Sequence, residues 1–216
     1  VGDNITIGDN NKFLISENII IDSCSYIGNN NSITCISASF GEYLYFDSNI
    51  IIGHGGSMNY SSEIHIGKQS MICSYVKLNT NYQIKIGDRV GIGENVDVWT
   101  HGSFLQVLDG YPYQFGGVNI GNDVWLPAKS TVLPNVNIGD NVVFGANSLI
   151  NKNIPSNSLC AGIPVKILKE NYYPKVLSNT QKVAIIEEAL SEYKLLCDFK
   201  KIDFSYEFLK EELTIK

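Results

Sequence analysis

The sequence predicts an all-β solenoid followed by a short helical extension. The main observation is an apolar residue at every sixth position between residues 120 and 150, namely Ile120, Leu126, Val132, Ile138, Phe144 and Ile150. The same spacing joins Ile86, Ile92 and Val98. A helix repeats about every 3.6 residues and a strand every 2, so a period of six indicates stacked repeats.

Each hexad predicts one short flat side, with its periodic apolar residue pointing into the core. Three hexads then form one coil of 18 residues, as from Ile120 to Ile138. Successive coils are expected at the strand separation of about 4.8 Å. A glycine follows the apolar residue at 87, 93, 121, 139 and 145, where it would permit tight backbone geometry near a corner. The neighbouring Asp and Asn residues (Asp88, Asn122, Asp123, Asp140, Asn141) are interpreted as turn residues.

Residues 1–78 are expected to form irregular coils of the same solenoid. Pairs of isoleucine and glycine recur there at 7–8, 27–28, 52–53 and 66–67. Steps of about 20 residues between some of these pairs indicate small insertions into the coils.

The chain beyond the last hexad predicts a change of structure. Residues 151–169 contain two prolines and no period, and they are interpreted as the end of a domain spanning 1–169. Residues 170–216 are expected to be a helical extension. A three-four spacing joins Val183, Ile186, Leu190, Tyr193 and Cys197, with Ser178 or Thr180 as the N-cap. A second helix is expected from Asp203 or Ser205, carrying Phe204, Phe208 and Leu213.

Composition narrows the function classes. The chain has 216 residues, of which 44% are hydrophobic and 18% charged, and it has a net charge of −6. This charge argues against a nucleic-acid partner, and no apolar run reaches the roughly 20 residues of a transmembrane segment. No secretory signal is visible, and the five cysteines are scattered, so a cytoplasmic protein with reduced thiols is expected.

The hexad period stops after Val98 and resumes at Ile120, and His101 lies in the gap. Residues 99–118 are expected to form a protruding loop rich in aromatic residues and glycine. A long loop inside a compact repeat is usually functional, and histidine suits proton transfer near neutral pH. His101 is therefore a candidate general base.

Several motifs in this region resemble those of one known family. They are Thr100–His101, then VNIGNDVWLPAKSTVLPNVNIG, FGANSLINKNIP and AGIPVKILK. Together they are similar to the hexapeptide-repeat acyltransferases, which fold as left-handed parallel β-helices, and notably to galactoside, maltose and capsule O-acetyltransferases. The resemblance covers residues 118–169 well.

The resemblance implies acetyl transfer from acetyl-CoA to a carbohydrate hydroxyl by a homotrimer without a metal, with His101 as the base and a role in capsule or lipopolysaccharide synthesis. The implied coenzyme-binding residues are Trp125, Ala128, Ala146, Asn151, Lys152, Lys166 and Lys169. Pro127–Ala128 departs from the more usual Gly–Ser or Gly–Ala pair. The acceptor candidates lie one coil before His101 or flank it, and they are Asn79, Asn81, Tyr82, Trp99, Tyr111 and Tyr113.

Three alternatives remain at this point. The acceptor could be the amine of an amino sugar carried on a nucleotide. The chain could be a non-catalytic scaffold. His54, His65 and His101 could bind zinc as in the γ-class carbonic anhydrases, which share this architecture. That family uses an H-x-x-x-x-H pair, and Gln106 stands five residues after His101, so His54 and His65 are interpreted as surface or corner residues.

Overall fold

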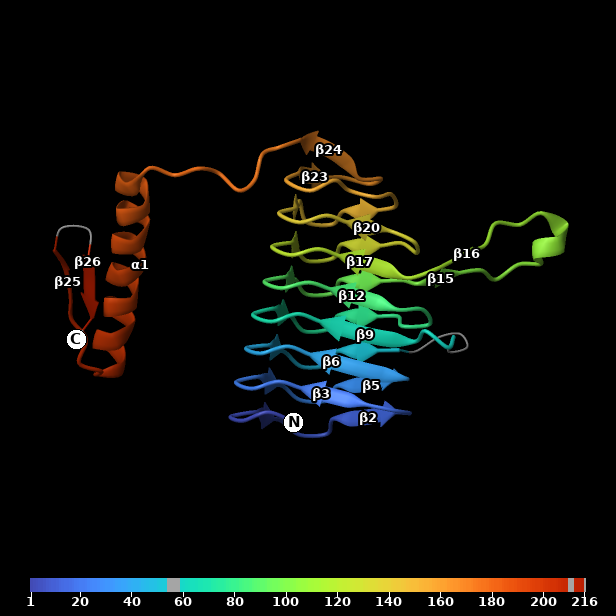
Figure 1. The fold of residues 1–216 in the computed structure, drawn as a ribbon, viewed down its shortest axis with the longest axis horizontal. Helices are drawn as coiled ribbons and strands as arrows, with labels where there is room; N and C mark the ends of the chain where they lie inside the picture. The colour runs from blue at the N-terminus through green and yellow to red at the C-terminus, as the bar shows by residue number, and fades with distance from the viewer. Residues whose placement is uncertain (54–58, 210–211, 216) are drawn as a thin grey trace. The chain divides into compact units, whose positions relative to one another are not determined.

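The computed structural model describes residues 1–53, 59–209 and 212–215, and it divides the chain into two compact units, residues 1–174 and 175–216 (Figure 1). The first unit is a stack of β-coils, in which each coil contributes short strands to three parallel sheets. Parallel coils of this kind fit the left-handed β-helix that the resemblance implies.

The three sheets form the faces of the solenoid, named here face A, face B and face C. Face A contains β1 (Thr6–Ile7), β4 (Tyr26–Ile27), β7 (Tyr45–Phe46), β10 (Met71–Ile72), β13 (Gly91–Ile92), β18 (Trp125–Leu126), β21 (Val143–Phe144), β23 (Leu159–Ala161) and the antiparallel β24 (Lys166–Lys169). Face B contains β2 (Lys12–Ile15), β5 (Ser32–Cys35), β8 (Ile51–Ile52), β11 (Lys77–Leu78), β14 (Asp97–Val98), β19 (Thr131–Val132) and β22 (Leu149–Ile150). Face C contains β3 (Ile19–Ile21), β6 (Ser37–Phe40), β9 (Glu63–Ile66), β12 (Ile84–Ile86), β17 (Val118–Ile120) and β20 (Asn137–Ile138).

The periodic apolar residues form the core, as the sequence predicts. All nine of the residues that establish the period, from Ile86 to Val98 and from Ile120 to Ile150, are at most 3% exposed. Ile27, Ile52 and Ile66 of the irregular coils are buried in the same way, whereas Ile7 in the first coil is 45% exposed. The in-register stacking of successive coils therefore produces one continuous aliphatic column.

Departures from the six-residue period occur at one corner of the solenoid, between face B and face C. The steps from face A to B and from face C to A are six residues, as in Ile92–Val98 and Ile86–Ile92. The steps from face B to C vary: Ile33–Phe40 is seven residues, Leu78–Ile86 is eight, Ile52–Ile66 is fourteen and Val98–Ile120 is twenty-two. The insertions predicted from the sequence therefore accumulate at this corner, called the B–C corner below.

The corners are stabilised by polar side chains that bond to the adjacent coil. The Oδ1 atom of Asp140 accepts the backbone N–H of Asn122 at 2.6 Å, and Asn122 Oδ1 accepts that of Asp88 at 2.8 Å. Asp123 and Asn141 adopt left-handed backbone angles, with φ of 56° and 57°. The predicted turn residues thus lie at turns.

Gly121, which follows a periodic residue, shows how such a glycine permits tight backbone geometry near a corner. Gly121 does not adopt a left-handed φ. Instead, a Cβ atom placed on it would lie 2.7 Å from the carbonyl carbon of Gly139 in the next coil. Glycine is required there because two backbones approach closely.

The second unit contains α1 (Asn179–Lys200) and a β-hairpin of β25 (Tyr206–Leu209) and β26 (Glu212–Ile215). Ser178 is the N-cap, and a capping box with Gln181 confirms one of the two predicted caps. The predicted second helix is wrong, because the segment forms strands. Among the described residues, no helix has the length and hydropathy needed to cross a membrane.

Candidate active site

His101 lies at the B–C corner, where the longest insertion leaves the coils. After β14, the chain forms an antiparallel hairpin of β15 (His101–Gly102) and β16 (Gln114–Phe115), with the 3₁₀ turn η1 (Val107–Asp109) between them (Figure 1). His101 is therefore the first residue of a protruding arm, at the point where the arm leaves the solenoid.

The imidazole of His101 is oriented by a residue from the preceding coil. Its Nδ1 lies 2.8 Å from the Oδ1 atom of Asn79, which is buried at the same corner. Thr100, also buried, donates its hydroxyl to the backbone oxygen of Asn79 at 2.7 Å and accepts the backbone N–H of Tyr82 at 3.0 Å. Two adjacent residues, Thr100 and His101, are thus hydrogen-bonded to one segment of the preceding coil.

This contact defines the protonation pattern of the ring. The side-chain oxygen of Asn79 can only accept a hydrogen bond, so Nδ1 must carry the proton that it receives. In the neutral imidazole the lone pair then belongs to Nε2. A histidine held in this tautomer, with Nε2 unprotonated, can abstract a proton from a hydroxyl.

The part of the arm nearest the solenoid is also hydrogen-bonded to the following coil. Gln114 donates its side-chain amide to the carbonyl of Pro134 at 3.0 Å, and Asn135 donates its own to the carbonyl of Phe115 at 2.7 Å. Gly116 has a φ of 149°, and a Cβ atom there would lie 1.7 Å from Asn135 Oδ1. Only glycine allows the arm to return this closely to the corner.

A cavity of about 500 Å³ adjoins the histidine. Its lining residues come from the arm and from the next coil, and they are Trp99, His101, Gly102, Pro112, Tyr113, Gln114, Leu133 and Pro134. The ring of Trp99 meets that of His101 edge-on, with centroids 6.1 Å apart. Leu133 and Pro134 were missed by sequence reasoning, because they lie more than 30 residues from His101 and carry no polar group.

The predicted acceptor residues occupy several positions around this corner. Trp99 and Tyr113 line the cavity, whereas Asn79 contacts His101 from the coil below. Asn81 is 8% exposed. The ring of Tyr82 packs against Phe115, with centroids 6.2 Å apart, and Tyr111 is exposed near the end of the arm. Thr100 belongs to the motif Thr100–His101 that carries the resemblance, but it was not among the predicted site residues.

The predicted coenzyme residues lie mostly on other parts of the solenoid. Trp125 is on face A and is 56% exposed. Ala128 and Ala146 follow strands of face A in successive coils, so they lie at the corner between faces A and B. The N–H of Asn147 bonds to the carbonyl of Ala128 at 3.0 Å, which stacks the two turns. Face B separates this corner from His101.

The polar coenzyme candidates are all exposed, and they fall into two groups. Asn151 and Lys152 follow β22 at the B–C corner, two coils beyond His101. Lys166 and Lys169 belong to β24 on face A, and the ammonium of Lys169 lies 4.3 Å above the ring of Tyr172. One chain therefore does not bring the predicted coenzyme residues together around His101.

Comparison with known proteins gives the same assignment as the motifs. Residues 117–152 match the family model described as bacterial transferase hexapeptide (six repeats). The chain is 36% identical to galactoside O-acetyltransferase of Escherichia coli K12 over 115 residues, covering 52% of this chain and 56% of the relative. The predicted resemblance to hexapeptide-repeat acyltransferases is confirmed.

Two further relatives extend this comparison. WbbJ of E. coli K12, provisionally named as a lipopolysaccharide biosynthesis O-acetyl transferase, is 32% identical, with 53% of this chain and 61% of the relative covered. The solved structure of a maltose O-acetyltransferase from Clostridium difficile 630 is 27% identical with a TM-score of 0.50, covering 61% of this chain and 68% of that one. The chain spans little more than half the length of the curated relatives that it matches.

His65 is separate from this site. His65 lies on face C, and His54 lies outside the described residues. Within the ranges 1–53, 59–209 and 212–215, no three His, Cys, Asp or Glu side chains are grouped as metal ligands.

Proposed function

We propose that this protein transfers the acetyl group of acetyl-CoA to a carbohydrate hydroxyl, with His101 as the general base. The observation that supports the proposal most directly is the contact between His101 Nδ1 and Asn79 Oδ1 beside a cavity lined by Trp99 and Tyr113. The names of the galactoside and maltose O-acetyltransferases support a sugar as the acceptor. WbbJ favours a lipopolysaccharide or capsule setting.

The proposed reaction needs no covalent enzyme intermediate. Nε2 of His101 removes the proton of the acceptor hydroxyl as its oxygen attacks the thioester carbonyl. The tetrahedral intermediate then collapses, the carbon–sulfur bond breaks, and the imidazolium returns the proton to the coenzyme A thiolate. Asn79 contributes because its oxygen stabilises the charged imidazolium more strongly than the neutral ring.

We further propose that the site is completed by a second copy of the chain in a homotrimer. His101 lies at the B–C corner, whereas Trp125, Ala128 and Ala146 lie on face A and at its corner with face B. If a neighbouring copy placed its corner between faces A and B against the B–C corner of this copy, His101 and the predicted coenzyme-binding residues would lie in one site. The arm supports such a contact, because Phe104 and Leu108 near its end are 98% and 92% exposed.

Replacement of the histidine tests the proposed function. In His101→Ala we expect acetyl transfer to fall by about 10²- to 10⁴-fold, the usual contribution of a general base. Coenzyme A binding measured by calorimetry should remain within about twofold of the original protein, because His101 is not one of the predicted coenzyme-binding residues. Turnover close to normal in the variant would refute the role of His101. Lability of the product to mild alkali would distinguish an ester from the amide that an N-acetyltransferase would make.

A further inference from the structure

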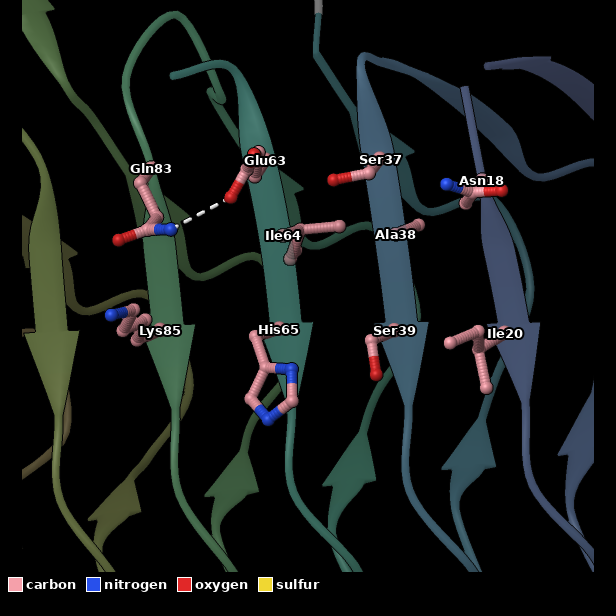
Figure 2. A pocket seen from close by; sticks show the side chains of 10 residues that line it. All are labelled: Asn18, Ile20, Ser37, Ala38, Ser39, Glu63, Ile64, His65, Gln83 and Lys85. Atoms are coloured by element: carbon pink, nitrogen blue, oxygen red, sulfur yellow. Dashed lines mark hydrogen bonds between the residues drawn. The ribbon is translucent and has the colours of Figure 1, made fainter. Parts of the chain in front are cut away.

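A second hollow lies on face C, in coils that precede the one carrying His101. It has a volume of about 570 Å³, which is within the usual range for ligand sites. Figure 2 shows that its lining side chains come from four adjacent strands, β3, β6, β9 and β12, and from the residues just before β3 and β12. Apart from Ala38 and Ile64, which lie between them, these side chains form two rows across the sheet. One row runs from Gln83 to Asn18, and the other runs from Lys85 to Ile20.

The hollow is produced by small residues on one strand between longer residues on its neighbours. Strand β6 presents Ser37 and Ser39 to the outside, and the intervening Ala38 is buried. In register with Ser39 are Ile20 on one side and His65 on the other. Because adjacent strands lie about 4.8 Å apart, these flanking side chains stand roughly 10 Å from each other.

The chemistry of the lining suits neutral hydroxyl groups. The hollow offers hydroxyls, amides, one imidazole and one carboxylate, so it can both donate and accept hydrogen bonds. Glu63 is held in place by Gln83, whose Nε2 lies 2.9 Å from its Oε2. Lys85 is the one Lys or Arg among the lining residues, which is too little positive charge for a phosphate-rich ligand. Ile20 adds an apolar surface for the carbon face of a sugar ring.

The hollow is connected to the candidate active site through residues 79–85. Asn79 at the start of this segment contacts His101, and the N–H of Tyr82 bonds to Thr100. Gln83 and Lys85 at its end line the hollow. The carbonyl of Gln83 also accepts the N–H of Val118, where the arm rejoins the coils. A chain lying in the hollow would therefore extend toward the corner that carries the base.

We infer that the face C hollow binds a carbohydrate chain of several units and presents one of its sugars to His101. The inference rests on the proposed function and narrows it, because it makes the acceptor an oligosaccharide or polysaccharide. The competing occupant is a second copy of this chain packed on face C. Carbohydrate is favoured because the lining is polar and mixed, whereas the centre of a subunit interface is depleted in charged residues.

A substitution that fills the hollow tests the inference. Ser39→Trp places a large ring between Ile20 and His65, and Ser32→Trp is the matched control on face B of the same coil, with similar partial exposure. Affinity electrophoresis would use maltoheptaose and de-O-acetylated lipopolysaccharide O-polysaccharide. We expect Ser39→Trp to weaken binding of at least one of these probes at least tenfold, and Ser32→Trp to change it less than twofold.

A second variant covers the case in which Ser39→Trp does not fold. Glu63→Ala removes the carboxylate without adding volume, and we expect it to weaken binding of the same probe about tenfold. The inference is overturned if neither probe binds the original protein, or if binding survives in both hollow variants. It is also overturned if sedimentation shows that Ser39→Trp alters the oligomeric state, since face C would then be an interface. Electrophoresis needs no catalysis, so a failure of acetyl transfer refutes the proposed function separately.

Discussion

Replacement of Asn79 is the sharpest test of how the histidine is held. In Asn79→Ala the acceptor atom 2.8 Å from Nδ1 is lost. A hydrogen bond to a charged group contributes about 1.5–3 kcal/mol and a neutral one about 1 kcal/mol, so the variant should lose about 0.5–2 kcal/mol of selective stabilisation of the imidazolium. At about 1.4 kcal/mol per tenfold, kcat should fall roughly 2- to 30-fold.

The fold should tolerate this change, because Thr100 also donates to the backbone oxygen of residue 79, which the substitution retains. Steady-state kinetics should show a lower kcat with an unchanged KM for acetyl-CoA. Asn79→Asp keeps an acceptor oxygen and should recover part of the lost rate.

Asn31→Ala provides the control for a buried amide. Asn31 is 1% exposed, and its side chain bonds to the backbone at Asp47 and Ile50, far along the chain from His101. This variant should lower Tm and leave kcat unaltered below the unfolding transition. If kcat in Asn79→Ala stays within twofold of the original protein, or if Asn31→Ala loses as much, Asn79 does not position the base.

Two further predictions concern the solenoid itself. Gly121→Val should lower the free energy of unfolding by about 2 kcal/mol or more, because its Cβ atom would lie 2.7 Å from the carbonyl carbon of Gly139; an unchanged Tm would contradict the close approach. Burial raises the pKa of the Cys160 thiol to about 11, so roughly one thiol in a thousand is ionised at pH 8, and iodoacetamide should label exposed Cys24 first by mass spectrometry. Equal labelling of the two cysteines in the folded protein would show that Cys160 is accessible.

The sequence was sufficient to predict the coils because their period is set by burial. A residue such as Phe144 or Ile150 must point inward at every sixth position, and no other common structure has that spacing. The contact between Asn79 and His101 was not predictable in the same way. The two residues are 22 positions apart, and only the register of adjacent coils brings them together. From the sequence, Asn79 was predicted as an acceptor-binding residue. In the structure its side chain contacts the imidazole of His101.

The wrong helix at the C-terminus has a similar cause. Phe204 and Phe208 are four residues apart, which fits a helix, but Tyr206 and Phe208 also alternate as in a strand. Over so few residues the two patterns cannot be separated, and pairing between β25 and β26 decides the outcome.

The number of residues per step varies at the B–C corner, whereas it is constant at the other two corners of the solenoid. Steps of seven, eight, fourteen and twenty-two residues cross this corner, while the hexads on either side keep their count. Chain length can therefore be added at the corner that carries His101 without moving any residue of the aliphatic column. In such a scaffold the residues at the B–C corner, and with them the proposed substrate specificity, can change while the residues that form the core stay the same.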